Sequence, residues 1–252
     1  MRLLAAFIFF TRLPFWKIAN VPSVYFKRIV EWWPITGWLT GGVTTAVLWV
    51  SINLFPIEIA ILLAFISRLL ITGALHEDGL ADFFDGFGGG TSRDKTLSIM
   101  KDSHIGTYGV ISLILYFALL YSAFISIPVE MLFMIIIVAD SWSKFCAAQL
   151  INILPYARNV EESKAKVVYD RMNVKGFLLS LVFGILPVLV FLELKFWIAM
   201  LAPLFIMFAL GHIMNKKIKG YTGDCCGATF LLCELSFYIC IVFILKFILR
   251  SI

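Results

Sequence analysis

The chain has 252 residues, of which 61% are hydrophobic and only 15% carry a charge. Soluble domains carry about 25% charged residues, so the composition excludes an ordinary soluble protein and indicates one that crosses a membrane several times. The net charge of +5 is too small to point to a nucleic-acid partner. The five cysteines have no CxxC spacing, so they predict neither a disulfide framework nor a zinc site.

Two apolar segments near the N-terminus, 3–10 and 25–33, are too short to span a bilayer, which takes about 20 residues of helix. We expect them to be interfacial or re-entrant, with Trp33 in a belt of tryptophans at headgroup level. Longer apolar runs follow at 35–55, 57–75, 109–127, 129–154, 176–192, 196–214 and 228–245. The sequence therefore predicts an all-α, polytopic membrane bundle of about seven transmembrane helices, forming a single membrane-embedded domain over residues 1–252.

Lysine and arginine are distributed unevenly among the connections. They precede the first span and fill the connections 76–108, 155–175 and 215–227, whereas 53–58 and 126–130 contain none. Cytoplasmic connections are the basic ones, so we expect the N-terminus and the three basic connections on the cytoplasmic side of the inner (cytoplasmic) membrane. The C-terminus then lies outside if the number of spans is odd.

Four carboxylates follow the second span closely, those of Glu77, Asp78, Asp82 and Asp85. The last three are spaced i, i+4, i+7, so a helix places them on one face, where they repel one another unless a cation lies among them. Acids are costly beside a bilayer, and an all-oxygen ligand set favours Mg²⁺, Mn²⁺ or Ca²⁺ over zinc. We therefore predict a divalent-cation site. The alternative is a solvated acidic face at a helix end.

The next segment is rich in glycine and in hydrogen-bond donors. Glycines such as Gly86 allow a backbone to approach a phosphate closely, although the GKS/T sequence of a Walker loop is absent. The donors suited to phosphate oxygens are Arg93, Lys101, Ser103 and His104. Asp102 adds an acid that could join the metal site. The alternatives are a flexible connector and a plain polar cap of the third span, with Ser103 as its N-cap.

Charged residues also occur inside the spans and directly after them. Arg68 in the second span, and Asp140 with Lys144 in the fourth, are intramembrane ionisable groups, which mark either a functional site or a structural ion pair. Arg158 follows the fourth span, and Asp224 lies in a glycine-rich segment before the last one; either segment could be a plain turn. Together the residues indicate a membrane enzyme that handles a phosphorylated substrate with a divalent cation at the cytoplasmic face.

Several of these motifs together resemble the cobalamin synthase family. They are HEDGLAD from His76 to Asp82, Asp85-Gly86 with its trailing glycines, IMKDSxIGxxG at 99–109, TGDxxGA at 222–228, FTRLP at 10–14 and LPYAR at 154–158. They occur in the order of the family and extend over nearly the whole chain. Each motif alone is weak, and their combination is specific.

The resemblance implies an adenosylcobinamide-GDP ribazoletransferase. Such an enzyme transfers the adenosylcobinamide-phosphate group of adenosylcobinamide-GDP to α-ribazole or its 5′-phosphate and releases GMP, which is the last assembly step of the cobalamin nucleotide loop. It also implies Mg²⁺, which we expect Asp78, Asp82 and their acidic neighbours to hold. The chemistry needs a base for the attacking hydroxyl and cations for the phosphates, for which we expect Asp85 and the basic residues Arg93, Lys101 and Arg158.

Two other classes of function remain open. A CDP-alcohol phosphotransferase, which makes phospholipids, exchanges groups on a nucleotide diphosphate with a similar Asp-rich motif, although that motif has an arginine where Asp82 stands. A cation-coupled transporter would hold its acids near the middle of the bilayer on broken helices, whereas these acids follow a span. Both substrates and the lipid bilayer are expected partners, and a homo-oligomer is compatible with every one of these functions.

Overall fold

The structure is a computed structural model that describes residues 1–158 and 168–248. Its helices, with η for turns that are not α-helical, are α1 (Arg2–Phe10), η1 (Phe15–Lys17), η2 (Ser23–Trp32), α2 (Trp33–Ile52), α3 (Ile57–Thr72), α4 (Leu75–Gly89), α5 (Arg93–Ile99), α6 (Thr107–Ser126), α7 (Val129–Ala148), α8 (Leu150–Ile153), α9 (Val174–Phe191), η4 (Leu194–Met200), α10 (Leu201–Ile218), α11 (Gly223–Phe243) and η5 (Ile244–Ile248). No β-strand occurs in the residues described, where a single isolated bridge joins Tyr156 and Tyr221. The all-α prediction is confirmed.

Six helical segments in the described ranges are long and apolar enough to cross a membrane. They are Ser23–Ile52, Thr107–Ser126, Val129–Ile153, Val174–Phe191, Leu194–Ile218 and Gly223–Phe247. The pair formed by α3 and α4 passes the same test only when its two helices are taken together, and they are bent by 89°. Counting that bent pair as one span gives seven, in agreement with the predicted bundle.

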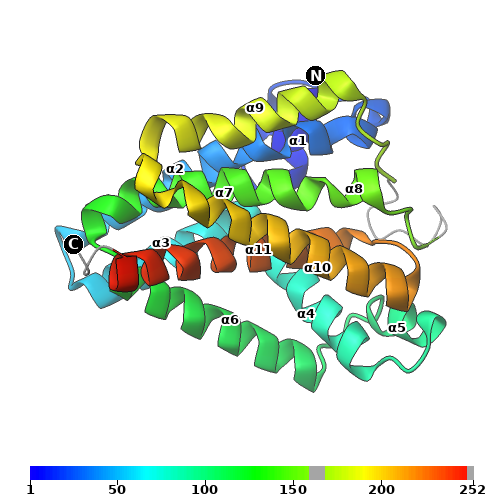
Figure 1. The fold of residues 1–252 in the computed structure, drawn as a ribbon. Helices are drawn as coiled ribbons and strands as arrows, with labels where there is room; N and C mark the ends of the chain where they lie inside the picture. Colours follow the sequence, from blue (N-terminus) through cyan, green and yellow to red (C-terminus); the bar gives the residue numbers. More distant parts are fainter. Residues whose placement is uncertain (159–167, 249–252) are drawn as a thin grey trace.

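The predicted span 57–75 is wrong at its C-terminal end because the chain turns sharply there. α3 ends at Thr72, and α4 begins at Leu75. Gly73 and Ala74 form the turn with positive φ angles of 65° and 54°, a left-handed conformation that glycine adopts readily and alanine rarely. The acidic segment therefore forms a helix of its own, which lies across the bundle instead of continuing α3 (Figure 1).

The FTRLP motif stabilises this turn. The backbone N–H of Arg12 donates a hydrogen bond of 2.7 Å to the carbonyl of Ile71, at the end of α3. The Arg12 side chain passes so close to Gly73 that a Cβ atom there would collide with it. Glycine is thus favoured at position 73 both by its backbone angle and by the closeness of the Arg12 side chain.

The segments 3–10 and 25–33 were both expected to be too short to span the membrane, and only the first of them is. α1 has nine residues, about 13 Å of helix, so it cannot span the roughly 30 Å hydrocarbon core; it packs instead on η2 and α2. The expectation for 25–33 is wrong, because η2 runs into α2 and forms one 30-residue segment with it. Only Arg28 departs from helical geometry along η2.

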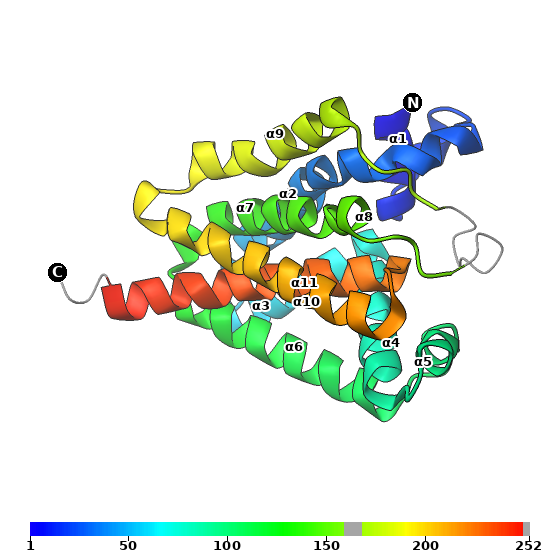
Figure 2. The same cartoon turned by 45° about the vertical axis from the view of Figure 1, so that its right-hand side comes forward.

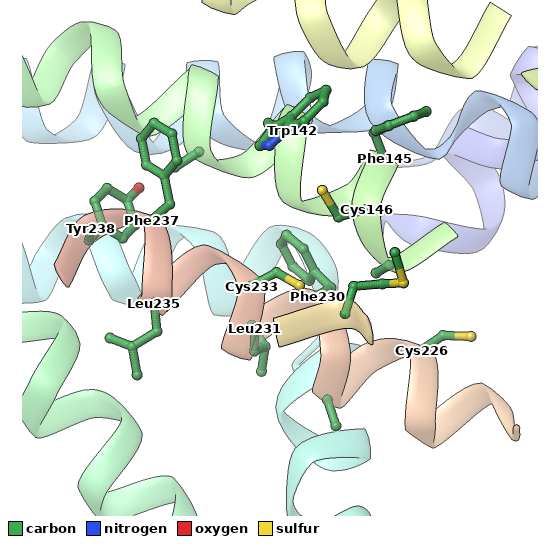
Figure 3. Close-up of a cluster of buried hydrophobic side chains, with 14 of the residues drawn as sticks. Trp142, Phe145, Cys146, Cys226, Phe230, Leu231, Cys233, Leu235, Phe237 and Tyr238 are labelled. Carbon is green, nitrogen blue, oxygen red and sulfur yellow. The ribbon is translucent and has the colours of Figure 1, made fainter. Parts of the chain in front are cut away.

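Helices α7 and α11 form the centre of the bundle. In the most apolar stretch of the α7 segment 78% of the residues are buried, and in that of the α11 segment 61% are. The corresponding fraction is only 28% in α6, in α9 and in the η4–α10 segment. Figure 3 shows Cys146 of α7 facing Phe230 and Cys233 of α11, while Trp142 and Phe145 stack on each other on the other side of α7. Because lipid tails are as apolar as these side chains, close packing rather than the hydrophobic effect holds the two helices together.

The charges predicted inside the membrane form ion pairs in this core. Arg68 of α3 contacts Glu234 of α11 at 2.7 Å, and Lys144 contacts Asp140 at 2.6 Å within α7. The hydroxyl of Thr40 in α2 donates to Asp140 at 2.6 Å and accepts a hydrogen bond from Lys144 at 2.8 Å. One group of polar side chains therefore joins α3 to α11 and the other joins α2 to α7, which favours the structural interpretation of these charges.

The motif-bearing segments gather at one end of the bundle. Figures 1 and 2 show α4, α5, the ends of α8 and α10 and the start of α11 together at the right-hand end. The α2–α3, α6–α7 and α9–η4 connections and the end of α11 lie at the other. This arrangement agrees with the expectation that the chemically rich segments share one side of the membrane.

Replacing Glu234 by alanine should strongly destabilise the bundle. It leaves the Arg68 guanidinium buried without its counter-charge, and breaking a buried pair in this way costs about 3–5 kcal/mol. Replacing both Arg68 and Glu234 by methionine should restore most of the loss, because no charge then remains. Thermal unfolding of the purified protein in detergent measures this, with Glu193→Ala, which breaks the exposed Lys195 pair, as the control. A double variant less stable than Glu234→Ala would contradict the assignment.

Candidate functional site

Helices α4 and α11 cross in close contact at two glycines. A Cβ atom at Gly79 would lie 3.0 Å from the carbonyl oxygen of Asp224, and one at Gly227 would lie 3.3 Å from the Cα atom of His76. Only glycine lets the two backbones approach this far. Thr222 is the N-cap of α11, and its hydroxyl oxygen accepts a hydrogen bond from the backbone N–H of Cys225 in the first turn. The crossing thus joins the HEDGLAD and TGD motifs.

The LPYAR segment is attached to the same place. The N–H of Tyr221 donates to the carbonyl of Pro155 at 2.9 Å, and its carbonyl accepts from the N–H of Ala157 at 2.8 Å. Arg158 is thereby held beside Asp224, with 3.8 Å between its Nη1 atom and the carboxylate Oδ2. The Arg158 side chain is buried, so this cation is fixed rather than freely mobile on the surface.

The acids of α4 differ in where they point. Asp78 is exposed and Asp82 half-buried, on one face of α4 as their spacing predicts. Asp78 and Asp224 line the same cavity from opposite sides of the crossing. Glu77 does not line that cavity: its side chain is buried, and its Oε2 atom has no hydrogen-bond partner among the residues described. Asp78 and Asp224 therefore lie together at the crossing, and Asp82 follows one turn further along α4.

Asp85 is engaged by the following helix. Its two carboxylate oxygens accept hydrogen bonds from the N–H groups of Gly106 at 2.6 Å and Gly109 at 2.8 Å. Gly106 is the N-cap residue of α6, where the first N–H groups have no partner within the helix and a negative charge is favourable. The Asp85 carboxylate thus takes the place of an N-cap side chain and fixes α6 to α4.

The predicted cluster of four acidic metal ligands is therefore not assembled. In residues 1–158 and 168–248, no group of three or more histidine, cysteine or acidic side chains is placed to hold a metal ion. Mg²⁺, however, commonly takes only one or two carboxylates and fills its other positions with water and phosphate oxygens. Asp78 and its neighbours at the crossing match that smaller requirement.

Three of the predicted phosphate donors meet at one pocket. Arg93, Lys101 and Arg158 line it together. The guanidinium of Arg93 also donates to the carbonyls of Ala157 at 2.6 Å and Ile218 at 3.1 Å, so it ties the pocket to the end of α10. Arg158 lines both this basic pocket and the acid-lined cavity, which makes the two spaces neighbours.

Ser103 and His104 lie apart from this basic pocket, on exposed surface. The backbone N–H of His104 donates to Asp102 at 3.0 Å, and its ring Nδ1 atom lies 2.7 Å from the same oxygen. The backbone hydrogen bond, followed by the ring contact, lowers the pKa of the Asp102 carboxyl. Ser103 is not the N-cap of the third predicted span either, since α6 has Gly106 at that position.

The glycine run is neither an open phosphate loop nor a flexible connector. α4 continues through it to Gly89. A Cβ atom at Gly86 would collide with Met100 and lie 3.0 Å from the carbonyl of Thr96. Gly86 therefore serves the packing of α5 and the turn after it against the end of α4, and this packing positions the basic pocket.

The acid-lined cavity has an aromatic wall that sequence reasoning missed. Its aromatic lining residues are Phe9, Phe10, Trp33, Tyr156 and Tyr169. Trp33 was expected in a headgroup belt, but it is only 2% exposed and stacks on Phe10 with 5.1 Å between ring centroids. The aromatic residues inside the FTRLP and LPYAR motifs, Phe10 and Tyr156, were the available signal.

Substituting Gly79 by alanine should separate α4 from α11 and destabilise the protein. The added methyl group meets the backbone of Asp224, which cannot rotate away, and such overpacking costs about 1–3 kcal/mol. The matched control is Gly42→Ala in α2, where a Cβ atom meets nothing within 4 Å. Thermal unfolding in detergent should show a lower midpoint for Gly79→Ala only. Equal midpoints for the two variants would show that the crossing tolerates a side chain.

Comparison with known proteins agrees with the geometry. A family model described as cobalamin-5-phosphate synthase matches residues 2–242. A protein of Shewanella sp. (strain W3-18-1) is 35% identical over 248 residues, covering 96% of this chain and 93% of the relative. One of Leptospira interrogans is 37% identical over 256 residues, covering 94% and 93%. Both relatives are named adenosylcobinamide-GDP ribazoletransferase.

No solved structure matches the chain, so the family assignment rests on sequence. The matched region contains every motif that forms the crossing, the acid-lined cavity and the basic pocket. The resemblance first seen in those motifs is thereby confirmed, and the chain belongs to the cobalamin-5-phosphate synthase family.

Proposed function

We propose that this protein transfers the adenosylcobinamide-phosphate group of adenosylcobinamide-GDP to a ribose hydroxyl of α-ribazole, or of its 5′-phosphate, and releases GMP. The observation that carries the proposal is that Arg158 lines two neighbouring spaces of different character. A pocket lined by Arg93 and Lys101 lies on one side of this cation, and a cavity lined by Asp78 and Asp224 lies on the other. The charge of a diphosphate has to be balanced by cations, and the attacking hydroxyl has to lie close by, next to a group that can accept its proton. A basic pocket beside an acid-lined cavity provides both.

The reaction is a displacement at phosphorus. A bond forms between the hydroxyl oxygen of the nucleoside and the phosphorus next to cobinamide, and the bond from that phosphorus to the GMP oxygen breaks. Arg93, Lys101 and Arg158 bind the leaving phosphate and balance its charge. A carboxylate accepts the hydroxyl proton, and we assign this role to Asp82, since Asp85 accepts two backbone hydrogen bonds.

Magnesium is the cofactor that these residues fit. Asp78 and Asp224 offer only oxygen, the ligand type that Mg²⁺ prefers, and they line a cavity next to the donors that would bind a diphosphate. When bound, Mg²⁺ would neutralise the diphosphate and stabilise the charge that develops on its oxygens. Glu77 is left out of this set because it is buried away from the cavity.

The position of the acids supports an enzyme over a transporter. They lie at one end of the bundle (Figure 2), whereas the coupling acids of a transporter lie near the bilayer midplane. The same end carries the basic connections, so the positive-inside rule favours a cytoplasmic orientation in the inner membrane. Both nucleotide substrates would then reach the site from the cytoplasm.

Purified protein should release GMP from adenosylcobinamide-GDP only when α-ribazole 5′-phosphate and Mg²⁺ are both present. Asp82→Asn should lower the rate roughly 100-fold or more, the contribution of a general base, while the exposed Glu58→Gln at the opposite end of the bundle keeps it. Chromatography of GMP and of the corrinoid product gives the measurement. Release that EDTA leaves unchanged, or transfer from a CDP-alcohol instead, would overturn the proposal.

Asp85→Asn separates the two roles considered for that residue. If Asp85 fixes α6 to α4, the Asp85→Asn protein should lose about 1.5–3 kcal/mol of stability. The reason is that an amide cannot accept hydrogen bonds from the N–H groups of both Gly106 and Gly109 as the carboxylate does. Thermal unfolding in detergent measures the loss, with the exposed Asp94→Asn as the control. A variant with normal stability and no turnover would instead make Asp85 the base that its place in the acid series predicts.

A further inference from the structure

The aromatic cavity beside Asp78 and Asp224 has the make-up of a site for a flat, weakly polar group. Its volume is about 140 Å³, close to the roughly 150 Å³ of an engineered apolar cavity that binds benzene. Its wall is formed by the aromatic residues Phe9, Phe10, Trp33, Tyr156 and Tyr169. Its charged lining residues are those that face the proposed reaction, namely Asp78, Arg158 and Asp224.

His76 gives this cavity a polar group that needs a partner. Its side chain is 2% exposed, and neither ring nitrogen has a hydrogen-bond partner among the residues described. The ring stacks on Trp33 at 5.8 Å between centroids and on Phe10 at 6.5 Å, and it meets Phe230 edge-on at 4.8 Å. Buried polar atoms in native proteins almost always have a partner, so an exception that lines a cavity points to a ligand atom.

We propose that this cavity binds the heteroaromatic base of the incoming nucleoside. The base packs against the rings of Phe10 and Trp33, and its unsubstituted ring nitrogen accepts a hydrogen bond from His76. The inference rests on the proposed function, because it gives one of the two substrates its place. The ribose would then extend toward Asp78 and Asp224, where the hydroxyl must attack.

The alternative occupant, the guanine of the leaving nucleotide, fits less well. Guanine carries an amide and an amino group, and leaving such groups buried and unpaired is unfavourable. Besides His76, the side chains with polar atoms that line this cavity are Asp78, Arg158, Asp224, Trp33, Tyr156 and Tyr169, and most of the lining is apolar. A base whose only polar atom is one ring nitrogen gives up few hydrogen bonds to water when it enters the cavity. The cations suited to the GMP phosphate lie in the other pocket, beyond Arg158.

The first test measures the KM for each of the two substrates separately. Trp33→Leu should raise the KM for α-ribazole about 10-fold, the size expected when one base–aromatic contact is lost, and leave the KM for adenosylcobinamide-GDP unchanged. The control is Trp32→Leu: Trp32 is the neighbouring residue, but it packs on Phe183 outside the cavity. A higher KM for adenosylcobinamide-GDP alone, or no change in either, would overturn the assignment.

The second test uses the ligand, so it does not depend on how well a variant folds. α-Ribazole is a benzimidazole riboside, and an indole riboside has the same shape but lacks the accepting ring nitrogen. Calorimetry with the wild-type protein should show about 10-fold weaker binding of the indole riboside, the loss expected for one unmade buried hydrogen bond. His76→Phe should bind both nucleosides equally. Equal binding of both by the wild type would refute the role of His76.

The two tests also separate this inference from the proposed function. Calorimetry measures nucleoside binding without any turnover, so a wild-type protein that binds the nucleoside selectively but releases no GMP would count against the function alone. A wild-type protein that releases GMP normally while Trp33→Leu has no effect would count against the cavity alone.

Discussion

The close approach of α4 to α11 is the constraint on which the site depends. Gly79 and Gly227 let two helices meet whose sequences lie far apart in the chain, and a Cβ atom at the tighter of the two contacts would lie only 3.0 Å from a backbone carbonyl oxygen. Asp78 and Asp224 face one cavity only because of this contact. Arg158 then joins through the short pairing of its own segment with residue 221. The HEDGLAD, TGD and LPYAR motifs therefore lie side by side because the backbones of α4 and α11 are in contact.

The buried charges give this contact a fixed orientation. Arg68 and Lys144 lie over the ring of Phe230 at 5.3 and 5.0 Å, and the same ring meets His76 edge-on. Cations over an aromatic face are attracted to it, the more so when water is excluded. A rotation of α11 would therefore disturb the Arg68–Glu234 pair and the packing of His76 together. The ion pairs of the core and the aromatic cavity are parts of one packed layer.

Sequence reasoning succeeded where a local pattern decides the structure. Apolar length predicted the spans, and the spacing of Asp78 and Asp82 predicted their shared face. It failed where a distant segment decides: the N–H groups that engage Asp85 belong to α6, and the residues that require Gly86 belong to α5 and the turn after it. Trp33 was misassigned for the same reason, since nothing near it in sequence shows that Phe10 and His76 cover it.

The sharp turn at Gly73 and Ala74 also sets the depth at which the chemistry takes place. A straight continuation of α3 would carry Asp85 about 20 Å beyond Thr72 along the helix axis. Because the chain turns by 89°, the acids stay level with the ends of the neighbouring helices. The proposed reaction would then take place level with the neighbouring helix ends and not on an arm that projects from the bundle.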